Sequence, residues 1–320
     1  MTTQKIARTD LAVSRIAYGC AKLVPLNSAP LDASAISSAE RLVQTSIDNG
    51  ITLFDLADHY GYFKAEEAFG KVLHRSPRLR QRIVIQSKAG VRGQTQPWLP
   101  GGYYLDCSRE HIVNSVEGSL RRLGTDHLDI LLLHYPDALG EPQEIAAAFE
   151  DLTASGKVRY FGVSNHTVSQ IELLRKVLRQ PVVVNQIPLG LALCDVIADG
   201  LNGNLADSTR VTGIIDYCRL HDICLQAHSP LQGTFANLPA DANPKAKEAA
   251  RVLARIAAAR STTPWVISLA WLLRHPAAIL PIIGSTDAAH ITENCAADSV
   301  HLDREEWYGL LVSAAAALQS

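Results

Sequence analysis

The chain has 320 residues, of which 47% are hydrophobic and 19% are charged, so it contains enough apolar material to bury a large core. Thirty Lys and Arg residues nearly balance 32 Asp and Glu residues, which leaves a formal net charge of −2. This balance excludes a strongly basic protein that binds nucleic acid or an anionic membrane through its overall charge. The length is compatible with two domains or with one α/β barrel.

The cysteine pattern favours a reduced protein without a metal centre. The six cysteines are scattered without a CxxC pair, and the chain has no HExxH motif, so zinc and iron–sulfur sites have no support. The N-terminal segment lacks an apolar run of signal-peptide length, and no stretch approaches the roughly 18 apolar residues of a membrane span. We therefore expect a soluble, cytoplasmic protein that binds no metal, nucleic acid or membrane.

Short apolar or β-branched runs alternate with longer segments of helical periodicity along the whole chain. This alternation is typical of βαβ units and a parallel sheet. The sequence predicts eight strands, at residues 16–19, 52–56, 83–88, 129–133, 160–163, 182–185, 224–227 and 279–282.

Ser and Thr residues stand before several of the apolar helical stripes, where they can cap the free N–H groups of a first turn. The expected N-caps are Ser38, Ser108, Thr167 and Thr263, the last followed by a proline that suits the first helical position. Glycines at positions 50 and 124 are expected to end the first two of these helices. A final helix is expected over residues 303–315, beyond the eighth strand.

Eight strand–helix units without a compositional break predict one domain over residues 1–320. We expect a (β/α)8 TIM barrel with an N-terminal hairpin and an extra C-terminal helix. The alternative is a doubly wound open sheet. A dinucleotide-binding sheet of that kind carries G-x-G-x-x-G after its first strand, whereas residues 18–23 here read YGCAKL.

Three predicted connections are unusually long, at residues 89–107, 187–210 and 229–245. Each follows a strand, so all three lie at the same end of the predicted barrel. Loops longer than about 12–15 residues are usually functional or disordered. We expect these loops to form the walls of a substrate pocket.

Polar residues that end consecutive strands are the candidates for chemistry, because barrel active sites lie at the carboxyl ends of the strands. Asp55 ends the second strand, Lys88 the third and His134 the fourth, while Tyr60 follows Asp55 in the segment FDLADHYG. A lysine and an aspartate that meet in a barrel mouth should pair, and the ammonium would lower the tyrosine pKa from about 10. Each residue alone also fits a structural role, but their joint appearance favours a catalytic group.

At these positions the sequence resembles the aldo-keto reductase superfamily, and the resemblance covers essentially the whole chain. The matching segments, in order, are FDLADHYG, QSKAG, LRRLGTDHLDILLLHYPD, SGKVRYFGVSN, VNQIPLG, HSPLQG and PIIGSTDAAHITEN. The segments GKVRYFGVSN and WLLRHP are most similar to a bacterial branch of NADP-dependent oxidoreductases. The resemblance implies a nicotinamide-dependent reductase of small aldehydes or ketones.

The resemblance also implies that Asp55, Tyr60, Lys88 and His134 form the catalytic tetrad. Tyr60 would protonate the carbonyl oxygen as general acid while the reduced nicotinamide gives hydride to the carbonyl carbon. Lys88, held by Asp55, would lower the pKa of the phenol. His134 would donate a hydrogen bond that orients the substrate oxygen.

Further positions match the cofactor-binding residues of the family. Ser164, Asn165 and Gln186 match the positions that hold the carboxamide, and His228 stands where the family usually has an aromatic ring under the nicotinamide. The full set of implied cofactor-binding residues is Gly19, Cys20, Asp55, Ser164, Asn165, Gln186, His228, Ser229, Leu231, Gly284, Ser285, Thr286, His290, Glu293 and Asn294.

The adenosine end of this set departs from the family pattern. Many members place a lysine and an arginine around the 2′-phosphate, whereas the corresponding positions here are Gly284 and His290. A histidine and backbone amides make a weaker phosphate clamp than an arginine fork. We expect NADPH as the cofactor, with NADH or dual use as the alternative.

The substrate pocket matches the family at Ala21, Lys22 and Tyr135, and Trp98 in the first long loop is a candidate for its wall. The pattern does not distinguish a sugar, an aromatic aldehyde, a dicarbonyl or pyridoxal, and it leaves the oligomeric state open. Two other functions are compatible with a barrel of this kind. One is a regulatory or redox-sensing protein that binds the cofactor with little turnover, and the other is an isomerase or aldolase with Lys88 as a Schiff-base amine.

Overall fold

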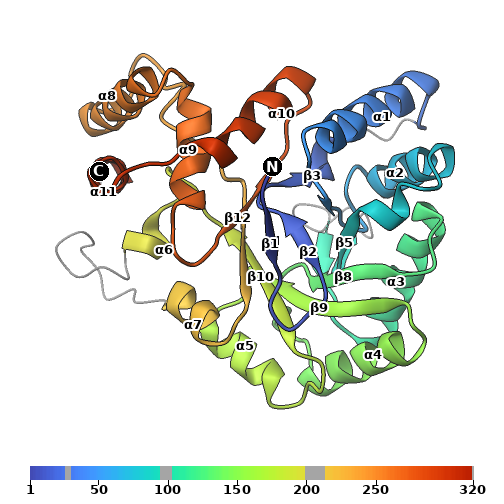
Figure 1. Cartoon of the computed structure of the whole chain (residues 1–320). Coiled ribbons are helices and arrows are strands. Elements are labelled where there is room, and N and C mark those ends of the chain that lie inside the picture. Colours follow the sequence, from blue (N-terminus) through green and yellow to red (C-terminus); the bar gives the residue numbers. More distant parts are fainter. Residues whose placement is uncertain (26–29, 94–102, 199–212, 319–320) are drawn as a thin grey trace.

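The computed structural model shows a closed barrel of eight parallel strands surrounded by helices (Figure 1). It describes residues 1–25, 30–93, 103–198 and 213–318. The barrel strands follow one another around the barrel in chain order. They are β3 (Ala17–Gly19), β4 (Leu53–Asp55), β5 (Val84–Ala89), β8 (Leu128–Leu133), β9 (Val158–Ser164), β10 (Val182–Pro188), β11 (Cys224–His228) and β12 (Leu280–Ile283).

These strands confirm the predicted (β/α)8 barrel, since each coincides with one of the eight apolar runs. The largest differences are at β9, which begins at Val158, and at β10, which continues to Pro188. Parallel strands buried on both faces consist almost entirely of apolar residues, and this makes them easy to recognise in the sequence.

The helices form a layer outside the barrel strands (Figure 1). The α-helices are α1 (Ala33–Asp48), α2 (Lys64–Arg75), α3 (Arg109–Leu123), α4 (Pro142–Ala154), α5 (Val168–Arg175), α6 (Asp195–Ala198), α7 (Ile214–Leu220), α8 (Pro244–Ala259), α9 (Pro264–Leu273), α10 (Ala288–Cys295) and α11 (Arg304–Leu318). Short 3-10 turns occur at Cys20–Lys22, Arg80–Arg82 and Ala296–Ser299. In the part of the chain just described, none of these helices is long and apolar enough to cross a membrane.

Three of the four predicted N-caps are confirmed and one is wrong. Ser108, Thr167 and Thr263 each accept a hydrogen bond from a first-turn N–H, and Gly124 ends α3 in the left-handed conformation. The prediction at Ser38 is wrong, because α1 begins at Ala33. Its N-cap is Asp32, whose carboxylate accepts from the N–H of Ala35 at 2.7 Å. Asp and Ser are about equally good N-caps, and here the helix begins at the earlier of the two and continues through Ser38.

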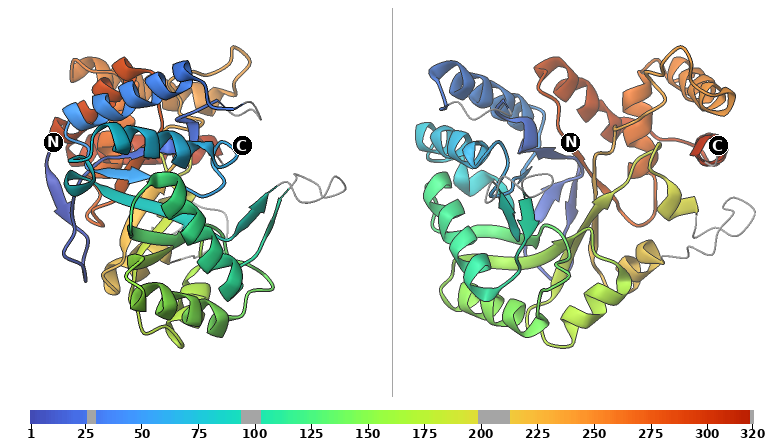
Figure 2. Two further views of the ribbon diagram at one scale, coloured as in Figure 1. Left: turned by 90° about the vertical axis from the view of Figure 1, so that its right-hand side faces the viewer. Right: turned by 180° about the vertical axis from the view of Figure 1, so that it is seen from behind.

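Two hairpins lie at opposite ends of the barrel (Figure 2). The N-terminal hairpin pairs β1 (Thr3–Lys5) with β2 (Ala12–Ser14), as predicted. Its side chains Ile6, Leu11 and Val13 are buried in one cluster with the interior residues of the barrel. The hairpin therefore closes one end of the barrel with apolar side chains.

The second hairpin corrects one prediction. Within residues 89–107, expected to be a loop, β6 (Val91–Gly93) pairs antiparallel with β7 (Tyr103–Leu105). Residues 94–102 between them, with Trp98, lie outside the described residues, as do residues 199–212 of the second long connection.

The C-terminal helix is held to the barrel layer by a pair of tryptophans. The indole N–H of Trp271 in α9 donates to the carbonyl oxygen of Trp307 in α11 at 3.1 Å, and the indole N–H of Trp307 donates to the carbonyl oxygen of Trp271 at 3.0 Å. The two rings stack with centroids 5.4 Å apart. This arrangement satisfies both buried donors and confirms the predicted final helix.

Two helical glycines differ in the space around them, which gives a paired prediction. A methyl group at Gly70 in α2 would lie 2.1 Å from the carbonyl oxygen of Arg122 in α3. At Gly309 in α11, among the described residues and apart from the nearby backbone of the helix itself, no atom lies within 4 Å of such a methyl group. We expect Gly70→Ala to lower the free energy of unfolding by about 2 kcal/mol or more. Gly309→Ala should raise it by about 0.5–1 kcal/mol. Urea denaturation measures both, and equal effects of the two changes would contradict the close packing of α2 on α3.

Candidate active site

A cavity of about 880 Å³ lies at the carboxyl ends of the barrel strands, and we call it the barrel-mouth cavity. The predicted site residues that line it are Gly19, Ala21, Lys22, Asp55, Tyr60, His134, Tyr135, Ser164, Asn165, Gln186, His228, Ser229, Leu231, Gly284, Ser285, His290, Glu293 and Asn294. These residues come from the ends of seven of the eight barrel strands, all except β5, and from the segments that follow them. The volume is within the usual range for cofactor and ligand sites.

Lys88 does not itself line the cavity, but it connects two residues that do, an aspartate and a tyrosine. Its ammonium lies 2.7 Å from a carboxylate oxygen of Asp55 and 3.1 Å from the hydroxyl of Tyr60, and it also donates to the carbonyl oxygen of Leu56 at 2.9 Å. Lys88 is only 1% exposed. Burial disfavours its charge, but Asp55 and Tyr60 outweigh burial and hold the pKa of the ammonium above its ordinary value.

Burial and Lys88 act on the pKa of Tyr60 in opposite directions. Burial raises this pKa above its ordinary value of 10.0, and Lys88 offsets only part of that increase. The lysine therefore acts in the expected direction, but burial has the larger effect on the pKa of the phenol. The hydroxyl is protonated at neutral pH, next to an ammonium that stabilises the phenolate once the proton has left.

His134 lies beside this group as a neutral ring. It is 6% exposed, and burial lowers its pKa well below 6.5, with further contributions from the nearby Lys88, His59 and His228. Its Nδ1 atom is buried and has no hydrogen-bond partner among the described residues. The centroids of the His134 and Tyr60 rings are 5.7 Å apart. A neutral imidazole carries one donor and one acceptor nitrogen, so His134 is able to contact a polar ligand atom next to Tyr60.

On the other side of the cavity, Asn165 is fixed by three hydrogen bonds. Its amide group donates to the carbonyl oxygen of His134 and to the hydroxyl of Ser164, each at 3.0 Å. Its Oδ1 atom accepts from Nε2 of His228 at 3.0 Å, because an amide oxygen cannot donate. Asn165 has a φ of 62°, a left-handed conformation that asparagine tolerates better than most residues.

The hydrogen bond to Asn165 also fixes the state of His228. Burial and the nearby Lys88 lower its pKa to about 4. The ring is therefore neutral at physiological pH, with its proton on Nε2 and with Nδ1 facing the Ser229 hydroxyl at 3.2 Å. Phe, Tyr or Trp at this position would provide a larger ring but would not donate from the same place.

The adenosine end of the expected cofactor site is formed by the segment after β12 and by α10. Ser285, His290 and Glu293 line the barrel-mouth cavity there, and Asn294 is buried at its edge. Thr286 instead lines a neighbouring cavity, which it shares with Lys22. Cys20 is fully buried and does not line the barrel-mouth cavity, and burial raises the pKa of its thiol well above 9.0.

The long connections contribute unequally to the cavity wall. In the third connection, residues Ser229–Gln232 line the cavity. The described residues of the connections at 89–107 and 187–210 do not line it. The expectation of three loop walls therefore holds only for the third loop among the described residues. The cavity residues that the sequence analysis did not select are His59, Pro230, Gln232, Trp265, Ile282 and Ile283.

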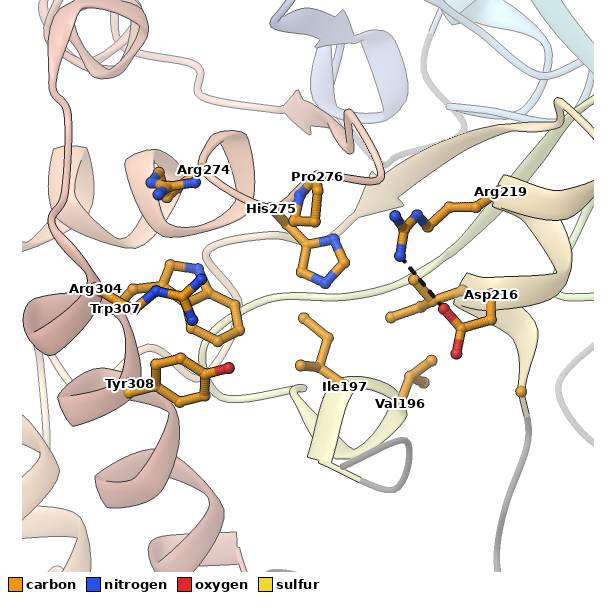
Figure 3. Close-up of a pocket in the computed structure, with 12 residues that line it drawn as sticks. Val196, Ile197, Asp216, Arg219, Arg274, His275, Pro276, Arg304, Trp307 and Tyr308 are labelled. Carbon is orange, nitrogen blue, oxygen red and sulfur yellow. Dashed lines mark ion pairs between the residues drawn. The ribbon is translucent and has the colours of Figure 1, made fainter. Parts of the chain in front are cut away.

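A second cavity, of about 400 Å³, lies between α7, the end of α9 and α11 (Figure 3). Three of its polar side chains already contact neighbouring groups. Arg219 is paired with Asp216 at 3.5 Å, Arg274 donates to the carbonyl oxygen of Leu302, and Nδ1 of His275 accepts from the N–H of Ala277. We therefore place the candidate active site in the barrel-mouth cavity. In the described part of the chain, neither cavity contains a group of three potential metal ligands.

Comparisons with known proteins identify the protein as an NAD(P)H-dependent oxidoreductase, in agreement with its parallel eight-stranded barrel. The sequence model of the Aldo/keto reductase family matches residues 15–310, so the chain belongs to this family.

Individual relatives agree with this assignment. The chain is 35% identical over 308 residues to the uncharacterised oxidoreductase YcsN of Bacillus subtilis, with 95% of each chain covered. It is 34% identical over 317 residues to the 6-dehydroglucose reductase of Novosphingobium aromaticivorans, with 97% of this chain and 95% of the relative covered. Among solved structures, the thermostable aldo-keto reductase Tm1743 in complex with epalrestat gives a TM-score of 0.77 at 25% identity, with 98% and 100% covered.

The buried histidines predict a loss of stability in mild acid. Burial lowers the pKa values of His166 and His228 to about 4, so the unfolded chain binds protons at these sites between pH 6.5 and 4 while the folded chain does not. The free energy of unfolding should therefore fall as the pH drops through this window, by up to about 1.4 kcal/mol for each unit of pKa difference. Urea denaturation at several pH values measures this slope. His166→Asn keeps a donor for the carbonyl oxygen of Ser164 and should reduce the slope; an unchanged slope would assign the acid sensitivity to other groups.

Proposed function

We propose that this protein reduces a small aldehyde or ketone to the alcohol, with Tyr60 as the general acid. The observation that carries this proposal is the buried Lys88 ammonium, which contacts the Asp55 carboxylate and the Tyr60 hydroxyl at the bottom of an open cavity. When bound, a reduced nicotinamide cofactor supplies the hydride for the carbonyl carbon. One hydride and one proton convert the carbonyl group into an alcohol.

The residues of the cavity suit a nicotinamide carboxamide. The amide protons of Asn165 and Gln186 are all used in contacts within the protein. Among the described residues, the carbonyl oxygen of Gln186 does not accept a hydrogen bond, and that of Asn165 accepts one from His228, which leaves it one lone pair. These two acceptor positions match the two N–H bonds of a carboxamide group. His228 provides a flat neutral surface beside them. These observations support Ser164, Asn165, Gln186 and His228 as the nicotinamide-binding residues.

Each member of the tetrad has a distinct task in this proposal. Tyr60 gives its proton to the carbonyl oxygen, and the Lys88 ammonium stabilises the phenolate that remains. Asp55 keeps Lys88 charged and in place, since a buried ammonium without a partner would lose its proton. His134 is neutral, and its ring hydrogen-bonds to and orients the substrate oxygen.

We propose NADPH as the preferred cofactor, with NADH as the alternative. His290 is an exposed residue of α10 at the adenosine end of the cavity. It stands where many family members have an arginine, so the 2′-phosphate would be held by imidazole and backbone N–H groups. The segment Gly284–Thr286 would contribute those N–H groups after β12.

The substrate is proposed to be a small carbonyl compound at the outer part of the cavity. Ala21, Lys22 and Tyr135 line this region, and Tyr135 stacks on His134 with ring centroids 4.8 Å apart. The name of the Novosphingobium relative indicates that it reduces an oxidised glucose, which makes oxidised sugars the first compounds to test. We further propose that residues 1–320 act as a single domain.

The central experiment removes the proposed acid. Tyr60→Phe keeps the ring and loses only the hydroxyl, so carbonyl reduction should fall by at least about 100-fold. The dissociation constant of NADPH should stay within a few-fold of the wild-type value. Steady-state assays with aldehydes, dicarbonyls and oxidised sugars, with both NADPH and NADH, measure the first effect, and calorimetry measures the second. Activity within a few-fold of wild type in this variant would refute the role of Tyr60.

A second experiment tests the phosphate clamp. His290→Arg should bind NADPH about fivefold to tenfold more tightly, because a guanidinium forms two hydrogen bonds with a phosphate and carries a permanent charge. Binding of NADH, which lacks the 2′-phosphate, should remain unchanged and is the internal control. Calorimetric titration with the two cofactors measures the difference. An equal change for both would show that position 290 does not contact the 2′-phosphate.

A further inference from the structure

Three glutamines meet inside the barrel at the floor of the cavity, where Gln186 lines it and the other two lie beneath. Gln86 lies on β5, Gln186 on β10 and Gln226 on β11, and none of them is more than 2% exposed. Gln186 and Gln226 are register partners on neighbouring strands, whereas β5 lies on the opposite side of the closed barrel from β11. We call these three residues the glutamine triad.

The triad spans the barrel interior by paired hydrogen bonds. The amide nitrogen of Gln86 donates to the oxygen of Gln226 at 2.8 Å, and the amide nitrogen of Gln226 donates back to the oxygen of Gln86 at 2.9 Å. Gln186 adds a third bond, from its amide nitrogen to the same oxygen of Gln226 at 3.0 Å. The oxygen of Gln226 therefore accepts two hydrogen bonds, which uses both of its lone pairs.

The carboxylate of Asp55 determines how these amides are oriented. Its Oδ1 atom accepts from Gln86 at 2.6 Å and from Gln186 at 3.0 Å, while Oδ2 accepts from Lys88. A carboxylate only accepts, so Gln86 and Gln186 must both turn their nitrogens toward Asp55. Gln226 must then present its oxygen to both nitrogens. Only one orientation of each amide satisfies all of these contacts.

This orientation has a consequence for Gln186, which lines the barrel-mouth cavity. Both of its amide protons are committed, one to Asp55 and one to Gln226. In the described part of the chain, its Oε1 atom does not receive a hydrogen bond. The triad thus leaves Gln186 with an acceptor, and not a donor, for a ligand in the cavity.

We propose that Gln226, together with Gln86, is a positioning residue for cofactor binding: it fixes the amide of Gln186 so that Oε1 accepts from the nicotinamide carboxamide. This inference rests on the proposed function and deepens it. Gln226 is 0% exposed and does not line the cavity, so it acts through Gln186.

A purely structural role would not require a polar group at position 226, because in the described part of the chain Gln226 does not donate to Asp55 as Gln86 and Gln186 do. The inward-facing residues two positions earlier on the same three strands are Val84, Val184 and Cys224, which pack in the apolar interior cluster. An apolar residue could fill the position of Gln226 as well. Burying three amides is favourable only if every hydrogen bond is made, so the layer stabilises one specific arrangement above all others.

The first test replaces Gln226 by methionine, which has a similar shape but cannot form these bonds. Without this acceptor, the amide of Gln186 loses one of its two hydrogen bonds and is held in its orientation by Asp55 alone. We expect the dissociation constant of NADPH, measured by calorimetry, and the KM for NADPH to rise about tenfold. The kcat with a reducible carbonyl should change less than threefold. A wild-type dissociation constant in Gln226→Met, or a lower kcat at unchanged affinity, would overturn the proposal.

The control is Ser87→Ala, at the position next to Gln86 on β5. Ser87 is also fully buried, but it faces outward and donates to Glu66 at 2.6 Å, away from Asp55. Loss of this bond should lower the folding stability while NADPH affinity stays at the wild-type value. If Ser87→Ala weakened NADPH binding as much as Gln226→Met does, the effect would be general destabilisation and the proposal would fail.

A third variant keeps the test valid even if Gln226→Met does not fold. Gln226→Glu has the same shape, and its protonated form provides one acceptor and one donor, as glutamine does. Burial raises the pKa of such a carboxyl group. We expect near-wild-type NADPH affinity at pH 5.5 and a growing loss of affinity, relative to wild type at each pH, as the pH rises to 8.5. A variant-to-wild-type ratio that does not depend on pH would overturn the proposal.

These binding measurements also separate the two proposals. If the wild-type protein reduced none of the carbonyl compounds, the proposed function would fail, but calorimetry would still decide whether Gln226 controls NADPH affinity. If Tyr60→Phe abolished reduction and Gln226→Met bound NADPH as wild type does, the proposed function would stand and the role of Gln226 would fall.

Discussion

The charge on Lys88 is the constraint on which the rest of this site depends. A buried ammonium costs several kcal/mol unless its protons are all used. Here they go to Asp55, to the carbonyl oxygen of Leu56 and to Tyr60. Asp55 in turn needs donors, and two glutamine amides provide them. The barrel interior thus has an apolar layer near the N-terminal hairpin, a polar layer that supports one ion pair, and an open mouth above it.

Most of the fold could be predicted because its signals are local. Buried parallel strands are short apolar runs, and Ser108, Thr167 and Thr263 are caps whose partners lie within one helical turn. The error at Ser38 arose because several residues before α1 could act as a cap, and only the structure shows that Asp32 does. The hairpin within residues 89–107 was missed because each of its strands is only three residues long and pairs with the other alone, which is too short for an alternating pattern to be recognised.

The sequence predicts which residues of the candidate site lie at strand ends, but it does not predict pKa values, which depend on burial. Asp55, Lys88 and His134 end consecutive strands, so the topology brings them together. The pKa of Tyr60 depends on how much water the ring loses, which a sequence does not reveal. The glutamine triad was missed for another reason. Gln86 lies two positions before Lys88, and Gln226 two positions before His228, so each glutamine faces the barrel interior like its neighbour. The contact between Gln86 and Gln226, however, crosses the barrel and forms only because the barrel is closed.

The tryptophan pair makes the C-terminal helix observable by spectroscopy. Trp271 and Trp307 stack almost in parallel, at an interplanar angle of 13°, and each indole N–H is tied to the main chain of the other helix. Rings held this close and this rigidly couple their electronic transitions, so the pair contributes a distinct near-ultraviolet circular dichroism signal. Undocking of α11 would remove that coupling and leave two buried donors without acceptors. Attachment of the last helix can therefore be followed separately from the unfolding of the barrel.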